Sequence, residues 1–459
     1  MESQEENSEN EIIMGMLRNF EYEMDQEDAT SELSQEHPDA TMDESDDEIP
    51  EAINIQSPEM DDNGILLSLA TPANAKTWNW ILGGNQKVRT PFANVSAGWT
   101  IELPEDAKEM DFWKLTFPDR ILSEVVKESN DYAIHVMENA DSLSRRQQKF
   151  QAVSYDEFLR YLAVRIIMRI DQKPEMAMYW SKDPILGSIV VRDILSSDRF
   201  YEIQRYLHLS DTETPNESDK IFKIRKLWDL TMNNFQNLVV PNDFLSVDES
   251  LVKSRARIKF KQFIPTKRNR FGVKTFSLVD ERTGFIVNSV IYEGKAMSAE
   301  NQTVSAADKK QFGHGGGIVL QLCQPYLGEF RTIFADNYFN SPNLAEKLLK
   351  ENTYLCGTLR SGRLNAPKPP KGMKRGDLEV RHDEQDAEIM VEFWRDKGVV
   401  KMISTGFEHA LVETNNAAGA PKQKLKTIIE YNNYARGIDR ADQMMGLYDT
   451  GRKTMKWYL

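Results

Sequence analysis

Four aspartates in the second half of the sequence have positions that suit metal-assisted chemistry. Asp248 ends one predicted strand, and Asp336 directly follows another. Asp439 and Asp442 are three residues apart on a predicted helix, so they lie about 60° apart around its axis and share a face. Because strand ends can lie beside one helix face, these four carboxylates are candidates for a single site.

Grouped carboxylates supply the hard oxygen ligands that Mg²⁺ and Mn²⁺ prefer. Two such ions about 3.5–4 Å apart activate an attacking oxygen and stabilise a leaving oxygen in phosphoryl transfer. A purely structural role is the alternative for each residue alone. Asp248 and Asp336 fit turns or caps, and Asp439 and Asp442 fit an ordinary solvated helix face.

A basic segment follows shortly after Asp248. Its nine basic residues, with no acid among residues 253–274, are Lys253, Arg255, Arg257, Lys259, Lys261, Lys267, Arg268, Arg270 and Lys274. Phe260, Phe263 and Phe271 are interspersed. Basic side chains bind phosphates and aromatic rings stack on unpaired bases, so the segment predicts nucleic-acid binding, with a solvated strand face as the alternative. Residues 360–375 add six basic residues without an acid, which favours a nucleic-acid phosphodiester over a small phosphate ester.

The net charge of -15 over 459 residues is unevenly distributed. Residues 1–62 contain 22 acidic residues and one basic residue, Arg18, which gives a formal charge of -21. Residues 63–459 contain 56 basic and 50 acidic residues, which gives +6. The acidic total therefore does not exclude a DNA partner. Dense like charge with few aromatic residues predicts a disordered arm, either a masking or partner-binding tail or a solubilising leader.

The cysteine count and the apolar pattern limit the class of protein. Cys323 and Cys356 are the only cysteines, too few for a disulfide scaffold or a Cys₄ or Cys₂His₂ zinc site, and both are expected to be buried. The sequence has no signal-peptide pattern and no apolar run of about 20 residues. A soluble intracellular chain without a membrane span is expected.

Periodicity predicts an α/β organisation in which helices come first. Helical spacing of apolar residues covers 111–137, 155–168, 193–209 and 221–235. Strand patterns then cover 244–248, 273–280, 285–292, 330–335 and 353–359, with a hairpin turn at 281–284 and a helix over 344–351. Residues 313–317 are expected to form a loop before a helix over 318–327. Residues 360–376 mark a linker or insertion boundary, 388–405 a hairpin, and 429–448 a final helix.

Several sequence blocks, in the same order, resemble the piggyBac family of transposases from about Trp99 to the end of the chain. They include FWKLTFPDRILSEVVKESNDYA (112–133), DRFYEIQRYLHLSD (198–211), VDESL (247–251), RFGVKTFSLVDERTGFIVNSVIYEG (270–294), FADNYFNSPNLAEKLLKEN (334–352), FWRDKGVVKMIST (393–405) and YNNYARGIDRADQMMGLY (431–448). A series of blocks is far more specific than any one motif.

The resemblance implies an RNase H-like core with a DDE/D set of carboxylates. Asp248 matches its first acid, Asp336 its second and Asp439 its third, and Asp442 matches a further acid of that site. Two Mg²⁺ or Mn²⁺ ions and no zinc are implied. The implied activity is cleavage and joining of double-stranded DNA at transposon ends, with insertion at TTAA. A homodimer and a nuclear location are implied as well.

The implied domains follow the chain. They are a disordered arm (1–62), a mainly helical dimerisation and DNA-binding region (63–242), the first part of the catalytic core (243–362), a β-rich insertion domain (363–425), and the final core helix with the start of a C-terminal region (426–459). Family members continue beyond the position of Leu459, and residues 266–269 replace a usual Lys-Pro. The alternatives are a catalytically inactive, transposase-derived DNA-binding protein and an interaction protein that acts through its acidic arm.

Overall fold

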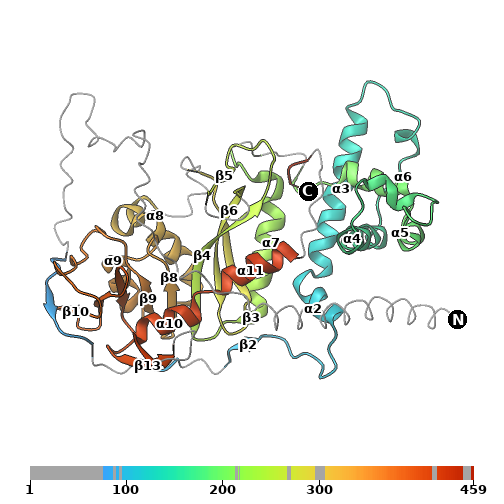
Figure 1. The fold of residues 1–459 in the computed structure, drawn as a ribbon. Helices are drawn as coiled ribbons and strands as arrows, with labels where there is room; N and C mark the ends of the chain where they lie inside the picture. Colours follow the sequence, from blue (N-terminus) through green and yellow to red (C-terminus); the bar gives the residue numbers. More distant parts are fainter. Residues whose placement is uncertain are drawn as a thin grey trace, which may run out of the picture. The chain divides into compact units, whose positions relative to one another are not determined.

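The computed structural model (Figure 1) describes residues 76–85, 89–92, 96–211, 216, 218–265, 270–294, 305–415, 421–447 and 456–458. The chain divides into two units, Met1–Thr77 and Trp78–Leu459, and every element below belongs to the second. The acidic arm expected over residues 1–62 lies outside the described residues. Lys267 and Arg268 of the basic segment lie outside them too.

Helices dominate the chain before the first long strand. They are α2 Glu109–Thr116, α3 Asp119–Glu138, α4 Tyr155–Ile170, α5 Ile189–Ile194, α6 Ser197–Tyr206 and α7 Phe222–Leu238, with 3₁₀ turns at Gln147–Lys149 and Met176–Trp180. All four ranges predicted as helical contain helices. The range 111–137 is divided between two helices, because Pro118 separates α2 from α3. Proline lacks a donor and disfavours a helical residue before it.

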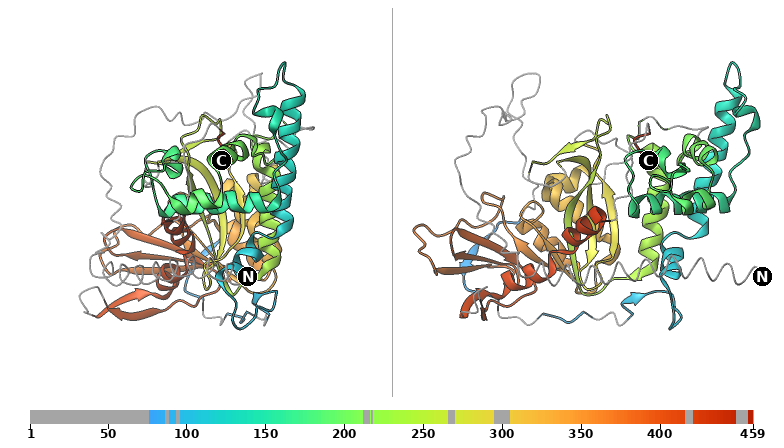
Figure 2. Two further views of the ribbon diagram at one scale, coloured as in Figure 1. Left: turned by 90° about the vertical axis from the view of Figure 1, so that its right-hand side faces the viewer. Right: turned by 45° about the vertical axis from the view of Figure 1, so that its right-hand side comes forward.

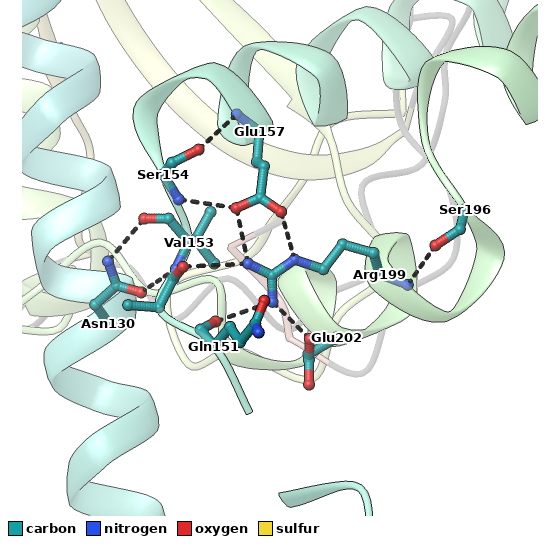
Figure 3. A network of polar contacts seen from close by, with 9 residues as sticks. Asn130, Gln151, Val153, Ser154, Glu157, Ser196, Arg199 and Glu202 are labelled. Carbon is teal, nitrogen blue, oxygen red and sulfur yellow. Dashed lines mark hydrogen bonds and ion pairs between the residues drawn. The ribbon is translucent and has the colours of Figure 1, made fainter. Parts of the chain in front are cut away.

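A polar network ties α4 to α6 (Figure 3). Ser154 and Glu157 form a capping box at the start of α4, in which each side chain accepts the other residue's backbone N–H. Arg199 of α6 donates two hydrogen bonds to Glu157, of 2.9 and 2.8 Å, and one of 2.6 Å to Glu202. The Arg199 side chain is only 14% exposed, so this pairing is largely shielded from water.

A ten-stranded mixed sheet occupies most of the remaining chain. Its strands are β1 Trp80–Leu82, β4 Phe244–Lys253, β5 Gln262–Phe263, β6 Phe271–Asp280, β7 Ile286–Ile291, β8 Thr332–Ala335, β9 Tyr354–Thr358, β10 Leu378–Asp383, β11 Met390–Arg395 and β12 Val399–Ser404. Their order is β1-β10-β11-β12-β9-β8-β4-β6-β5, with β7 beside β6. β4, β8 and β9 run parallel, and the other pairs are antiparallel. The predicted α/β class is confirmed.

Two short ribbons lie apart from this sheet. β2 (Gly98–Trp99) pairs with β3 (Val239–Val240), and β13 (Leu411–Asn415) pairs with β14 (Pro421–Leu425). Residues 363–425, the predicted insertion, supply β10 to β14. Three of these strands, β10 to β12, continue the main sheet, because β12 pairs with β9.

Helices cover both faces of the central strands (Figures 1 and 2). They are α8 Ala306–Cys323, followed by a 3₁₀ turn at Gln324–Tyr326, then α9 Pro342–Lys350, α10 Lys426–Tyr434 and α11 Gly437–Leu447. Alternate residues of a strand point to opposite faces. Val247 of β4 packs in one core with Ile318 of α8 and Leu344 of α9. Phe244 packs on the other face against Tyr434 of α10, with ring centroids 4.3 Å apart.

The loop predicted over 313–317 was wrong, because α8 runs through it with a kink at Gly313 (φ 75°, ψ 174°). The glycines that suggested a loop serve close packing instead. A Cβ on Gly315 would lie 2.6 Å from the Tyr338 carbonyl oxygen, and one on Gly316 would lie 2.9 Å from Phe312 Cβ. The expected final helix over 429–448 is also two helices, α10 and α11, with a break at residues 435–436.

Both cysteines are buried free thiols, as predicted. Cys323 lies in the core between the sheet and α8, and Cys356 lies in the core on the other face of the sheet. Within the part of the chain that the structure describes, no helix is both long enough and apolar enough to cross a membrane.

Candidate active site

Asp248 and Asp336 lie side by side at the centre of the sheet. Val247 of β4 is the register partner of Ala335 of β8, and each aspartate is the next residue of its chain. Neighbouring strands are about 4.8 Å apart, so the two residues start from adjacent backbone positions. Asp248 is not at a strand end as predicted, because β4 continues to Lys253 along β6.

The loop after β8 holds the Asp336 carboxylate by its own backbone. Asp336 Oδ1 accepts a 2.8 Å hydrogen bond from the N–H of Tyr338. Burial raises the pKa of Asp336, and the negative charge of Glu249 raises it further, against the opposing hydrogen bonds from Tyr338 and Phe339. The carboxylate is therefore partly desolvated and lies within electrostatic range of a second acid.

Tyr431 of α10 lies within electrostatic range of both Asp248 and Asp336. Burial raises the pKa of Tyr431, and the charges of Asp336 and then Asp248 raise it further. Both carboxylates therefore act on the same phenol. This agrees with the strand register, which places them next to each other.

Arg363 clamps the Asp336 loop from the start of the insertion. Its Nη2 donates to the carbonyl oxygens of Asn337, at 2.5 Å, and Tyr338, at 2.8 Å. Burial lowers the pKa of Arg363, while the Asp336 charge opposes that change. In the sequence, Arg363 is only part of a basic stretch. The fold shows that its side chain holds the loop after Asp336 through the two carbonyl oxygens.

On the opposite face of β4 from Asp248, Glu249 forms an ion pair with Lys274 of β6 at 3.2 Å. Lys274 Nζ also lies 4.6 Å from the ring centroid of Phe276 and 5.4 Å from that of Tyr338. His314, just after the kink in α8, shares a 3.0 Å hydrogen bond with the Tyr338 hydroxyl. Sequence reasoning missed Glu249 and His314, and it assigned Lys274 to DNA, whereas the structure places Lys274 inside this network.

The two acidic residues of α11, Asp439 and Asp442, differ in their exposure to solvent. Asp442 is half-buried, and its Oδ1 accepts a hydrogen bond from Ser250 Oγ of β4. Ser250 and Asp248 lie on the same face of β4 because they are two residues apart. Asp439 is exposed. The fold thus brings Asp442 to the Asp248 face of the sheet, with Asp439 one turn earlier on the same helix.

The donor chemistry of these residues suits a hard cation, since carboxylate oxygens are the ligands that Mg²⁺ and Mn²⁺ prefer. Asp248 lies in β4 and Asp336 directly follows β8, the parallel neighbour of β4, so the two residues start from adjacent backbone positions. Within the described ranges, however, no set of three or more Asp, Glu, His or Cys side chains is arranged to hold a metal ion. The assignment of all four aspartates to one metal site stays a prediction.

The basic segment leaves β4 and presents its charges to solvent. Lys253, Arg255, Arg257, Lys259 and Arg270 are exposed. Lys261 turns back, and its Nζ donates a 2.9 Å hydrogen bond to the carbonyl of Ala256. The exposed residues alternate with half-buried ones between 254 and 259, so the basic side chains project from a segment anchored on the body.

The three phenylalanines of this segment have different environments. Phe260 is 3% exposed and packs edge-on against Trp457, with ring centroids 5.5 Å apart. Phe263 and Phe271 are 53% and 49% exposed, and their rings are 4.7 Å apart. Phe260 is thus a core residue, while the other two form an exposed aromatic pair among the cations.

Comparisons with known proteins agree with this arrangement. The family model described as Transposase IS4, a DDE transposase domain, matches residues 108–459. The human PiggyBac transposable element-derived protein 2 is 28% identical over 388 residues, which are 78% of this chain and 61% of that protein. The human PiggyBac transposable element-derived protein 3 is 25% identical over 443 residues, 91% of this chain and 68% of that protein.

A solved structure shares the fold. The cryo-EM structure of a piggyBac transposase synaptic complex with hairpin DNA matches with a TM-score of 0.65 at 24% identity, over 79% of this chain and 73% of that one. The chain spans less than two thirds of the first relative's length. The match of the family model over most of the chain shows that this protein belongs to the Transposase IS4 family of DDE transposases and is a homologue of the piggyBac transposable element-derived proteins.

Proposed function

We propose that this chain cleaves and joins DNA strands in a metal-dependent reaction of the piggyBac type. Asp248, Asp336, Asp439 and Asp442 are its proposed metal-binding and catalytic acids, in a core of RNase H-like type. The observation that carries the proposal is that Asp248, in β4, and Asp336, directly after the parallel neighbouring strand β8, occupy adjacent positions in a DDE-family chain. Neighbouring carboxylates can hold the divalent ions that activate the attacking oxygen and stabilise the leaving oxygen in phosphoryl transfer.

Bound Mg²⁺ or Mn²⁺ would polarise the scissile phosphate and lower the pKa of the attacking hydroxyl. Asp248 and Asp336 would hold the ions from β4 and from the loop after β8. Arg363 and the Tyr338 backbone keep that loop fixed. On the opposite face of β4 from Asp248, Lys274 neutralises the charge of Glu249.

The proposed reaction is a series of phosphoryl transfers of the same kind. Water first attacks a phosphodiester at the element end, and the bond from phosphorus to the 3′ oxygen breaks, leaving a 3′-hydroxyl and a 5′-phosphate. That 3′-hydroxyl then attacks a phosphodiester of the opposite strand, which closes a hairpin at the element end. A second water opens the hairpin and frees the 3′-hydroxyl again, and this hydroxyl attacks a phosphodiester of the target, proposed to be TTAA. Each attack forms one P–O bond and breaks another, so no co-reactant other than water is needed.

Double-stranded DNA is the proposed partner, in a homodimer located in the nucleus. The exposed Arg255, Arg257, Lys259 and Arg270 support phosphate contacts, because cations that displace counterions from the backbone provide most non-specific affinity. The exposed Phe263 and Phe271 rings support stacking on an unpaired base. The matched solved structure is a piggyBac transposase synaptic complex with hairpin DNA.

The test is nicking of a labelled TTAA-containing duplex by the purified full chain in Mg²⁺ or Mn²⁺. We expect strand cleavage that stops on chelation and is abolished by Asp248→Asn and by Asp336→Asn. Asp198→Asn, on an exposed aspartate of α6, is the matched control and should cleave normally. Cleavage that persists in Asp248→Asn and Asp336→Asn would refute the assignment.

The second candidate is a DNA-binding protein that does not cleave. It is favoured by the lack, among the described side chains, of a group of three acids already arranged for a metal. Its signature is salt-sensitive DNA binding by wild type with no nicking at any Mg²⁺ or Mn²⁺ concentration. Asp248→Asn would then leave DNA affinity unchanged.

A further inference from the structure

One face of β4 carries three polar residues in alternation, Ser246, Asp248 and Ser250. Residues two apart on a strand point to the same side, so the two serines flank the aspartate. Ser246 and Ser250 are 3% and 4% exposed. The helix α11 packs against this strand. Ser250 contacts a residue of α11, and Ser246 contacts a residue that binds the start of α11.

The first contact runs through Glu281, the residue that follows β6. Glu281 is 6% exposed, and its Oε1 accepts hydrogen bonds from Ser246 Oγ and, at 2.7 Å, from the backbone N–H of Gly437. Gly437 is the first residue of α11. The first N–H groups of a helix have no partner within the helix, and a carboxylate there also interacts favourably with the helix dipole.

The approach at this point is so close that only glycine fits. A Cβ on Gly437 would lie 2.5 Å from Val279 Cγ1 and 2.7 Å from Glu281 Oε1. The next residue, Ile438, is 2% exposed. The start of α11 is therefore fixed against the sheet by one hydrogen bond, one close contact and one buried side chain.

The second contact lies one turn further along the helix, where Ser250 Oγ donates to Asp442 Oδ1. Two attachments five residues apart on a helix set both its position along the strand and its rotation about its own axis. Asp248 lies between the two serines, so the same attachments set where Asp439 and Asp442 stand relative to it.

We infer that Glu281 is a positioning residue that, together with Ser246 and Ser250, holds α11 against the Asp248 face of β4 and so sets where Asp439 and Asp442 stand relative to Asp248. This inference rests on the proposed function for its catalytic consequence, but the docking itself does not require cleavage. Because misplacing a catalytic group by about 1 Å costs up to about 100-fold in rate, loss of this attachment should lower turnover more than DNA binding.

The test compares Glu281→Ala with Glu281→Gln in the full chain. Glutamine keeps an oxygen that accepts from Gly437 and Ser246, whereas alanine does not. We expect hydrogen-exchange protection of the α11 amides to fall roughly 10- to 100-fold in Glu281→Ala, the range for one charged hydrogen bond, and to recover in Glu281→Gln. DNA cleavage should follow the same order, with kcat reduced and KM unchanged. Glu413→Ala, on an exposed glutamate of β13, is the control.

Ser250→Ala provides an independent variant that leaves Glu281 in place. It should lower protection around Asp442 and lower kcat, while protection at Ile438 stays as in wild type. Unchanged α11 protection in Glu281→Ala would overturn the inference, and so would a Glu281→Gln variant as weakened as Glu281→Ala. If wild type protein never nicks DNA, the proposed function fails, and the exchange data still decide whether Glu281 holds α11.

Discussion

Asp248 and Asp336 stand at equivalent positions, each one residue past the paired Val247 and Ala335 of two parallel strands. The backbone that holds each aspartate differs after these positions. β4 continues along β6 to Lys253, whereas the chain after β8 turns into a loop. One acid is thus carried by a continuous strand. The other depends on the loop contacts from Tyr338 and Arg363.

Neutralising Asp336 should stabilise the protein at neutral pH. Burial raises the pKa of Asp336 above its usual 3.8, so the folded state binds this proton more tightly than the unfolded chain does. Stability therefore falls as the pH rises through this window. Asp336→Asn removes that loss, and its melting temperature should exceed that of wild type at pH 7. The difference should vanish as the pH falls well below 3.8, where this carboxyl is neutral in both the folded and the unfolded protein. A lower melting temperature at pH 7 would contradict this.

A methyl group at Gly357 of β9 should disrupt the support of the Asp336 loop. A Cβ there would lie 1.8 Å from the Ala335 carbonyl oxygen and 2.4 Å from Asn340 Nδ2. Both atoms are held in place, since Asn340 Nδ2 donates to that carbonyl. We expect Gly357→Ala to lower the free energy of unfolding by more than about 4 kcal/mol, measured by chemical denaturation.

Gly398, in the turn between β11 and β12, gives the matched control. A Cβ on Gly398 meets nothing within 4 Å. Gly398→Ala should therefore change the free energy of unfolding by no more than about 0.5 kcal/mol. Equal effects of the two substitutions would mean that the close approach at Gly357 is not what limits its side chain.

The Arg199 network should be a main stabilising feature of the helical region. Its guanidinium forms two parallel hydrogen bonds to Glu157 in a shielded position. Arg199→Ala is expected to cost about 2–3 kcal/mol of unfolding free energy, because Glu157 loses its charged partner. Arg146→Ala breaks an ion pair to Asp198 in which both side chains are more than half exposed, and should cost about 0–1 kcal/mol. Similar losses in both variants would show that shielding does not strengthen the Arg199 pair.

The exposed cations after β4 should control the salt dependence of DNA binding. Removing a side chain that neutralises one phosphate should reduce the slope of log affinity against log salt by about 0.9. Replacing Arg255, Arg257 and Lys259 together by alanine is expected to reduce the slope by about 2–3, as measured by fluorescence anisotropy with duplex DNA. Lys350→Ala, on α9, removes another exposed charge and should leave the slope unchanged. An unchanged slope in the triple variant would place the DNA elsewhere.

The sequence predicted features whose signal is local. Alternation located β6 and β7, and Asp336 follows β8 as expected. Features set by contacts between distant segments were missed. The glycines of α8 suggested a loop, but Gly315 is needed for a close approach to Tyr338, 23 residues later. Nothing in the local sequence reveals that approach. Likewise, Glu281 looks like an ordinary turn residue in the sequence. Its role depends on Gly437, which lies 156 residues away, so no local pattern predicts it.

The three-residue strand β1 pairs with the outer side of β10, at residues 381–383. An open strand edge is a template for pairing with another chain, and a very short terminal strand is one of the ways in which proteins cap such an edge. A chain shortened to begin after Leu82 would leave β10 uncapped. We expect such a chain to aggregate at concentrations at which the full chain remains dispersed, because β1 would no longer cover the edge of β10.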